Sequence, residues 1–266
     1  MQATHHIFLS PHYDDAALSC GGLMAQLSAA GEHTVAATLF GGKPDYARLS
    51  PFARMIHGRP LAGQDPIEQR RAEERRALAL LEAESWQGDY LDCIYRQDAT
   101  QARWLYSSED ALFGPVDPAD DDLVDELARW LAAQATRPEE VILYAPLAIG
   151  NHVDHQIVQR SAALLQQRGY PVRFYEDYPY IVRDPAGLER SLDRLAARGR
   201  WQVHVVPLQQ ADLQRKIDAV MAYASQLGVL FPGDGALPAR VAGALEDYAR
   251  QAGNGRPAER LWQLPR

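Results

Sequence analysis

Cysteine and long apolar stretches are what this chain of 266 residues lacks most clearly. Its two cysteines, Cys20 and Cys93, exclude a disulfide framework and a cysteine-rich metal site, and they favour a reducing compartment. No apolar stretch reaches the length of a membrane-spanning helix, and the sequence does not open with a basic segment followed by an apolar run. We therefore expect a cytoplasmic protein without a membrane span.

An excess of positive charge is also missing. The chain has 27 basic and 35 acidic residues, which gives a formal net charge of -8. This balance argues against nucleic acid or an anionic membrane surface as the main partner, and it suits a small-molecule substrate. A chain of this length can bury a sizeable core but is short for two full domains. We expect a single domain over residues 1–266.

Predicted strands alternate with predicted helices along the chain. Apolar runs predict strands at 6–10, 34–40, 88–93, 141–145, 172–176, 201–207 and 259–264. Helical periodicity predicts helices at 16–30, 67–84, 123–134, 155–168, 212–227 and 238–251. Such alternation is typical of parallel βα units. It predicts a Rossmann-like α/β fold, doubly wound around a mostly parallel sheet with helices on both faces, with ligands bound at the carboxyl ends of the strands.

Two connections are long for a compact domain. They cover residues 41–66 and 94–122, and structureless loops of more than about a dozen residues are uncommon unless they serve as lids or binding loops. The second connection carries Trp104, Tyr106 and Phe113, which argue against a purely solvated excursion. We interpret both connections as the rim of an active site.

Two polar clusters follow predicted strands. Residues 11–15 read Pro-His-Tyr-Asp-Asp, and residues 151–155 read Asn-His-Val-Asp-His. Each cluster also opens a helical pattern, where unpaired N–H groups stabilise negative charge. Because the carboxyl ends of parallel strands share one edge of a sheet, we expect the two clusters to meet in space.

The residue types in these clusters suit a catalytic metal, which typically takes three protein ligands and keeps a position for water. His12, Asp15 and His155 can supply that set, and this leaves Asp14 and His152 beside the metal. A free carboxylate can take a proton from water, and a free imidazolium can stabilise an oxyanion or protonate a leaving amine, which suits amide hydrolysis. Asp154 can orient one of the histidines. We also expect Asp154 to hold the pKa of His152 above its ordinary value of about 6.5.

Each element also has a purely structural interpretation. Either aspartate can be the N-cap of the following helix, and a His-x-x-His pair can lie on a surface helix. The occurrence of both clusters after strands weakens these interpretations. Gly21 and Gly22 favour close packing of helix on sheet or a loop in place of the helix, and we give them no catalytic role. We assign Cys20 to the buried core rather than to nucleophilic chemistry.

Taken together, Pro11–Asp15 with Gly21-Gly22 and His152–His155 resemble the two motifs of the PIG-L/LmbE family of zinc-dependent N-deacetylases. The similarity covers nearly the whole chain, since it extends to Arg70-x-x-Glu73, Lys216-x-x-Ala219, Tyr223-x-Ser225-Gln226 and the closing Glu259-Arg260-Leu261-Trp262.

The resemblance implies a Rossmann-like fold with Zn²⁺ bound by His12, Asp15 and His155, and ferrous iron is an alternative ion. It further implies Asp14 as the general base and His152 as the electrophilic or acid partner. Members of the family commonly deacetylate N-acetylglucosamine carried on a lipid, an inositol or another aglycone. The substrate expected here is therefore an N-acetylated sugar or glycoconjugate.

Further residues are expected around the substrate. Arg70 belongs to this group, as do Tyr178 and Tyr180 in the segment 175–180, which follows a predicted strand. Tyrosines offer a flat apolar face to a pyranose ring and a hydroxyl to its polar edge. An ordinary turn with packed aromatic side chains is the alternative for this segment.

The sequence departs from the family pattern at two positions. Tyr13 stands where the family usually has Pro, and Ala16 stands where it usually has Glu. Neither position is a predicted ligand or base, so the expected activity is kept. The missing carboxylate leaves open how the substrate is recognised.

Two other functions compete with the deacetylase. A non-haem iron oxygenase would use two histidines and one carboxylate, with Asp14 as the ligand, but such enzymes use antiparallel β barrels. A catalytically inactive carbohydrate-binding relative would keep the pocket without turnover. The presence of all five reactive residues argues against it.

Overall fold

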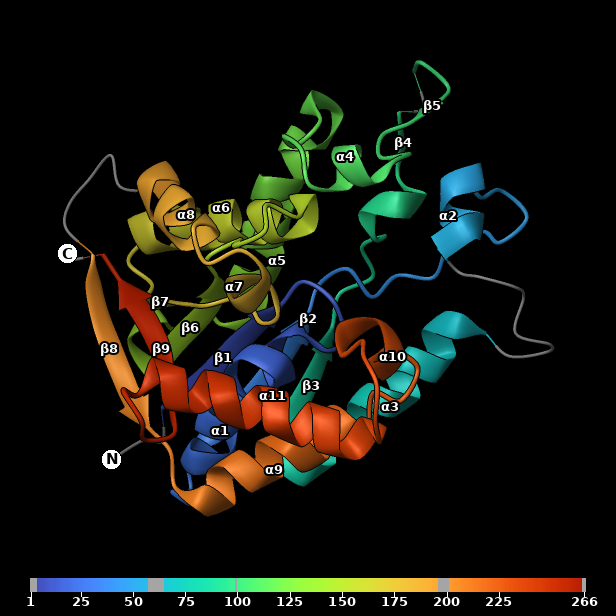
Figure 1. Cartoon of the computed structure of the whole chain (residues 1–266). Coiled ribbons are helices and arrows are strands. Elements are labelled where there is room, and N and C mark those ends of the chain that lie inside the picture. The colour runs from blue at the N-terminus through green and yellow to red at the C-terminus, as the bar shows by residue number, and fades with distance from the viewer. Residues whose placement is uncertain (1–3, 57–64, 99, 196–200, 265–266) are drawn as a thin grey trace.

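A seven-stranded sheet forms the centre of the protein, in the order β3-β2-β1-β6-β7-β9-β8 (Figure 1). The computed structural model describes residues 4–56, 65–98, 100–195 and 201–264. The strands are β1 (His5–Ser10), β2 (His33–Thr38), β3 (Glu84–Gln87), β6 (Val141–Pro146), β7 (Val172–Tyr175), β8 (Gln202–Pro207) and β9 (Ala258–Gln263). The first five strands of the order run parallel, and β9 runs antiparallel to both of its neighbours. The predicted mostly parallel sheet is confirmed.

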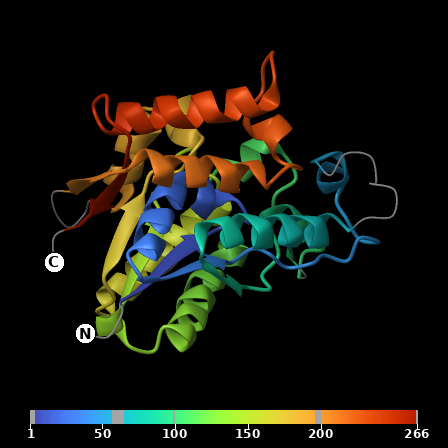
Figure 2. The same cartoon turned by 90° about the horizontal axis from the view of Figure 1, so that it is seen from below.

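Helices cover both faces of the sheet (Figure 2). On one face α1 (Asp15–Ala29), α3 (Pro66–Leu81), α9 (Gln210–Met221) and α11 (Leu237–Ala252) pack together. On the other face α5 (Asp121–Gln134) lies against α6 (Val153–Gln167). No helix among the described residues is long and apolar enough to cross a membrane.

The two faces follow from the alternation of side chains along β1. Phe8 belongs to a buried cluster with Cys20 and Met24 of α1, whereas Ile7 and Leu9 belong to a cluster that includes the α5 residues Leu127 and Leu131. The three consecutive apolar residues Ile7–Leu9 let β1 be buried on both faces, as a central parallel strand must be. The assignment of Cys20 to the core is confirmed, since its side chain is fully buried.

Several predicted elements differ from the structure. The third strand is β3 at Glu84–Gln87 rather than 88–93, because a half-polar edge strand has no apolar run to mark it. Helix α9 ends at Met221, well before the predicted end at residue 227. Beyond this end, the backbone N–H and the hydroxyl of Ser225 donate to the Glu73 carboxylate instead of continuing the helix. Outside the two long connections, the sequence did not predict the short helices α7 (Tyr180–Arg183), α8 (Gly187–Leu195) and α10 (Leu227–Leu230).

The two long connections contain structure of their own. They hold α2 (Pro51–Ile56), α4 (Glu109–Leu112), a hairpin of β4 (Gln97–Asp98) and β5 (Arg103–Trp104), and 3-10 turns at Cys93–Tyr95 and Pro118–Asp120. Residues 57–64 of the first connection lie outside the described residues. Both connections contribute to one small core, which joins Phe52 to Ile94, Tyr106 and Leu112 and reaches Val153 at the start of α6. We call this cluster the rim core.

Candidate active site

The two polar clusters lie side by side at the carboxyl ends of β1 and β6, which are neighbours in the sheet. After β1 the chain turns at residues 11–14 and enters α1 at Asp15, and after β6 it turns at residues 147–152 and enters α6 at Val153. The Nε2 atom of His12 lies 3.0 Å from Oδ2 of Asp154, which joins one cluster to the other. The expectation that the clusters meet is confirmed.

Within the part of the chain that the structure describes, three possible metal-ligand atoms lie within 4.8 Å of one another, one each from His12, Asp15 and His155. Oδ2 of Asp15 lies 3.3 Å from Nδ1 of His12 and 3.3 Å from Nε2 of His155. Two ligands about 2.0–2.1 Å from a zinc ion at tetrahedral angles are themselves about 3.3–3.4 Å apart. The donor types and their spacing therefore fit a zinc ion.

Each of the two histidine rings has a carboxylate on the side away from Asp15. Nδ1 of His155 donates to Oδ1 of Asp177 at 2.6 Å, and Nε2 of His12 donates to Asp154. Burial lowers the pKa of both rings, but the carboxylates on either side outweigh it and raise both pKa values, so each ring is an imidazolium here. A metal ion at this position would replace the proton on the nitrogen that faces Asp15, while the opposite N–H stays with Asp154 or Asp177. Asp177 is a site residue that the sequence reasoning missed, although it follows β7, the sheet neighbour of β6.

Asp14 lies next to this set without joining it. Its Oδ1 accepts a hydrogen bond from Nη2 of Arg70 at 3.1 Å, and its side chain is buried. Burial raises the pKa of Asp14, Arg70 lowers it, and the neighbouring Asp15 raises it again. Burial also opposes ionisation of Asp15, but His155 and His12 outweigh it and hold the pKa of Asp15 well below its ordinary value.

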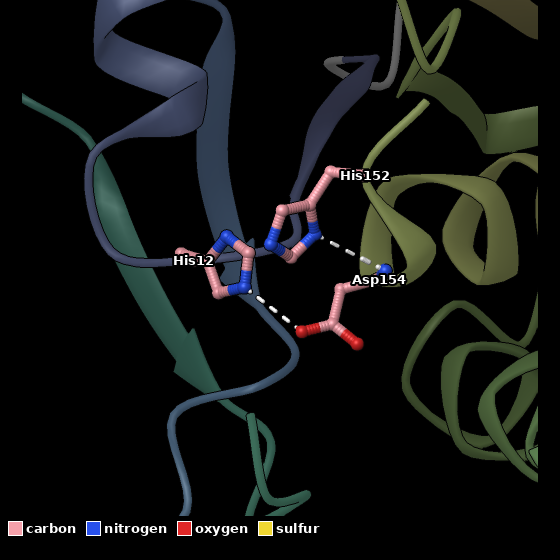
Figure 3. Close-up of side chains that lie close together, drawn as sticks. All are labelled: His12, His152 and Asp154. Atoms are coloured by element: carbon pink, nitrogen blue, oxygen red, sulfur yellow. Dashed lines mark hydrogen bonds and ion pairs between the residues drawn. The ribbon is translucent and has the colours of Figure 1, made fainter. Parts of the chain in front are cut away.

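His152 caps the start of α6 and lies beside His12 and His155. Its Nδ1 accepts a hydrogen bond from the backbone N–H of Asp154 at 3.3 Å (Figure 3). Its ring centroid lies 5.0 Å from that of His12 and 5.4 Å from that of His155. Because Nδ1 is an acceptor here, the proton of a neutral His152 ring resides on Nε2.

The expected imidazolium at His152 is wrong for this structure. Burial lowers the pKa of His152 to about 3, His12 also lowers it, and the opposing effect of Asp154 is smaller. The Asp154 carboxylate hydrogen bonds to His12 and to the backbone N–H of Cys93, so it orients His12 rather than His152. A neutral His152 with a proton on Nε2 is the form that this environment favours.

The two tyrosines of the segment 175–180 lie in different places. Tyr180 lies at the site, with its ring 5.7 Å from that of His155 and 6.0 Å from that of Phe113. Tyr178 packs in the core, where its ring lies 5.4 Å from Tyr248 and 6.0 Å from Phe231. The prediction of Tyr178 as a substrate residue is therefore wrong, because its buried side chain packs against Phe231 and Tyr248.

A cavity of about 400 Å³ lies between Phe113, the turn at Gly150 and Asn151, and α8. Phe113 forms one wall, and its ring also meets His152 edge-on at 5.5 Å. Arg190 and Arg194 of α8 form another wall, and Arg194 donates to the backbone carbonyl of Ala148 at 2.9 Å. Since Phe113 comes from the second long connection, that connection does border the site as expected.

Known proteins resemble this chain over most of its length. The PIG-L model, described as GlcNAc-PI de-N-acetylase, matches residues 7–165. A 2'-N-acetylparomamine deacetylase from Niallia circulans is 29% identical over 239 residues, which cover 85% of this chain and 82% of the relative. The deacetylase of the same name from Streptomyces fradiae is 30% identical over 232 residues, covering 83% of this chain and 72% of the relative. The crystal structure of the zinc-inhibited form of a teicoplanin deacetylase matches with a TM-score of 0.82 and 29% identity, over 97% of each chain.

Proposed function

This chain belongs to the PIG-L family of de-N-acetylases, and on that premise we propose that it is a zinc-dependent hydrolase that removes an N-acetyl group from an N-acetylglucosamine-type sugar conjugate. The observation that carries the proposal is the set of His12, Asp15 and His155 around one point, with the Asp14 carboxylate beside it. This arrangement suits amide hydrolysis.

Zinc is the proposed ion, held by Nδ1 of His12, Oδ2 of Asp15 and Nε2 of His155. When bound, zinc supplies a Lewis acid that acidifies water and polarises the amide carbonyl. The zinc-inhibited form of the teicoplanin deacetylase supports this choice, whereas none of the reported relatives points to ferrous iron.

Asp14 is the proposed general base. Its Oδ1 is held by Arg70, and the burial that raises its pKa also makes it a better proton acceptor than an exposed carboxylate. Asp14 takes one proton from the attacking water as the new C–O bond forms. The same proton can then pass to the amine nitrogen as the C–N bond breaks, which leaves acetate and a free amino sugar.

His152 is the proposed electrophile in its neutral form. With Nδ1 occupied by the backbone N–H of Asp154, its Nε2–H can donate to the carbonyl oxygen as negative charge develops there. A neutral histidine whose pKa is lowered at a helix N-terminus can polarise a carbonyl in this way. No separate imidazolium acid is then needed, because Asp14 carries the proton.

A sugar conjugate fits the surroundings of the site. Tyr180 and Phe113 offer aromatic faces next to the metal ligands, and the adjoining cavity leaves room for the group to which the sugar is attached. The 2'-N-acetylparomamine deacetylases carry an N-acetyl sugar in their name, which supports this substrate class. Two buried free cysteines agree with the cytoplasmic location that we propose.

The competing oxygenase does not agree with the structure. Its fold would be an antiparallel barrel, whereas this sheet is mostly parallel, and its carboxylate ligand would be Asp14, whereas Asp15 lies between the two imidazoles. A non-catalytic sugar-binding protein remains the alternative that an activity assay must test.

The test is release of acetate from a panel of N-acetylated glycosides, followed by mass spectrometry for loss of one acetyl group. We expect turnover with added zinc, loss of turnover after chelation, and recovery when zinc is restored. The absence of acetate release from every glycoside, by protein that binds the sugars and zinc, would favour the non-catalytic alternative.

A further inference from the structure

Arg96 is a buried arginine at the start of the second long connection, directly after the Cys93–Tyr95 turn. Its Nη2 lies 2.7 Å from Oδ1 of Asp154 in an ion pair, and its Nε donates to Asp120 at 2.8 Å. Its Nη1 donates to the backbone carbonyl of Leu91 at 2.9 Å. One guanidinium group thus joins two carboxylates and a backbone carbonyl.

Aromatic rings hold this guanidinium in place. Its central carbon lies 5.0 Å from the ring centroid of Phe40 and 5.3 Å from that of Tyr106. Cation–π contacts of this kind are stronger where water is excluded, and only 8% of the Arg96 side chain is exposed. The position of Arg96 is therefore fixed from several directions at once.

The carboxylate that Arg96 contacts is the one behind His12. Asp154 is completely buried, and its Oδ2 accepts from Nε2 of His12 at 3.0 Å (Figure 3). The same oxygen also accepts from the backbone N–H of Cys93 at 3.1 Å. A buried carboxylate needs a compensating charge, and Asp92, whose carboxylate lies within 4.8 Å of that of Asp154, adds negative charge instead. Arg96 supplies positive charge on the other oxygen of Asp154.

We propose that Arg96 is a positioning residue for the zinc site, and this inference rests on the proposed function. Arg96 holds the Asp154 carboxylate so that Oδ2 faces Nε2 of His12, and the lone pair on Nδ1 of His12 then faces Asp15 and the metal position. Residues that orient metal ligands in this way contribute about 10–100-fold to metal affinity.

The test compares zinc dissociation constants of the purified protein and its Arg96→Gln variant, measured by competition with a chromophoric chelator. We expect the variant to bind zinc about 10–100-fold more weakly. The matched control is Arg103→Gln in the same connection. Arg103 pairs with Asp117 and is 40% exposed, so its removal should change zinc affinity less than twofold.

A purely structural role is distinguished by two further measurements. Such a role would lower the free energy of unfolding of the zinc-free protein and leave the zinc affinity of the folded protein unchanged. In the zinc-loaded protein the Nε2–H proton of His12 should exchange faster with solvent in Arg96→Gln, as followed by histidine ¹⁵N NMR, because the Asp154 carboxylate that accepts it is no longer held. If Arg96→Gln does not fold, Arg96→Lys replaces it, because an ammonium group cannot reproduce the forked contacts to Asp154 and Asp120.

The outcomes separate the two proposals. Failure of the unmodified protein to bind zinc would overturn the metal assignment itself. If the unmodified protein binds zinc, and the folded Arg96 variant has a zinc dissociation constant within twofold of it, the positioning role alone is overturned.

Discussion

The substitution Asp14→Asn separates proton transfer from metal binding. Asparagine keeps nearly the same shape but is not a base, so the step in which Asp14 accepts a proton is lost. Asp14 has no place among the three ligand atoms, and its hydrogen-bond partner is Arg70. The variant should therefore keep its zinc.

The expected loss of activity is large. General base catalysis is worth about 10²–10⁴-fold in rate, which corresponds to about 3–5 kcal/mol of transition-state free energy. We expect kcat to fall by that factor while the zinc content stays at one ion per chain. Stability should not fall in parallel. Because the pKa of Asp14 is raised, the folded protein disfavours its ionised form, and a neutral side chain removes that cost at neutral pH.

Asp15→Asn is the matched control, since it changes the adjacent carboxylate in the same way. Oδ2 of Asp15 lies between Nδ1 of His12 and Nε2 of His155, so this variant should lose zinc together with activity. Zinc content by elemental analysis and initial rates of acetate release provide the two readouts. Equal loss of zinc in both variants, or near-normal turnover by Asp14→Asn, would refute the division of roles.

Other predictions concern a neutral histidine and two buried charges. His152→Ala should bind zinc normally and turn over slowly, while the alkaline limb of kcat/KM stays in place, because burial keeps the pKa of His152 at about 3; a lost limb would contradict this. Lys216→Met should lower the free energy of unfolding in urea by about 3–5 kcal/mol, because it leaves the buried Glu259 carboxylate without its cation at 2.7 Å. Lys43→Met, at a half-exposed ion pair, should cost less than about 1 kcal/mol as its control. Burial raises the pKa of Glu74 from 4.5 to about 7. The protonated Glu74 side chain therefore contributes fully to the free energy of unfolding below pH 4.5, and this contribution is lost as the pH rises through about 7. Glu74→Gln should therefore flatten the fall of Tm across this range, and an unchanged slope would show that other groups cause it.

The sheet and the two polar clusters could be predicted because local sequence determines both. The apolar run of β1 and the polar residues directly after it specify a buried strand that ends at a site. The second cluster stands in the same relation to β6, and parallel pairing of β1 with β6 brings the clusters together. The joint position of His12 and His155 needed no further information.

Contacts between distant segments could not be predicted in the same way. Arg96 contacts Asp154, which is 58 residues away in sequence, and Asp177 contacts His155, which is 22 residues away. Neither pairing produces a repeating pattern of apolar and polar residues from which it could be predicted. The charge state of His152 depends on how deeply it is buried and on which atom of Asp154 faces it, and sequence spacing reports neither. The strand β3 was misplaced for a related reason, since its exposed residues have no apolar pattern.

The rim core has a consequence for how new specificities could arise on this scaffold. Phe52, Tyr106 and Leu112 belong to one cluster, and this cluster reaches the proposed metal site through Val153, which is next to His152 in the chain. Insertions in the surface turns of the two connections can therefore reshape what the site accepts while the residues that cleave the amide keep their positions. In directed evolution, libraries confined to the exposed turns around β4 and β5 should yield more folded, active variants than libraries that include the rim core.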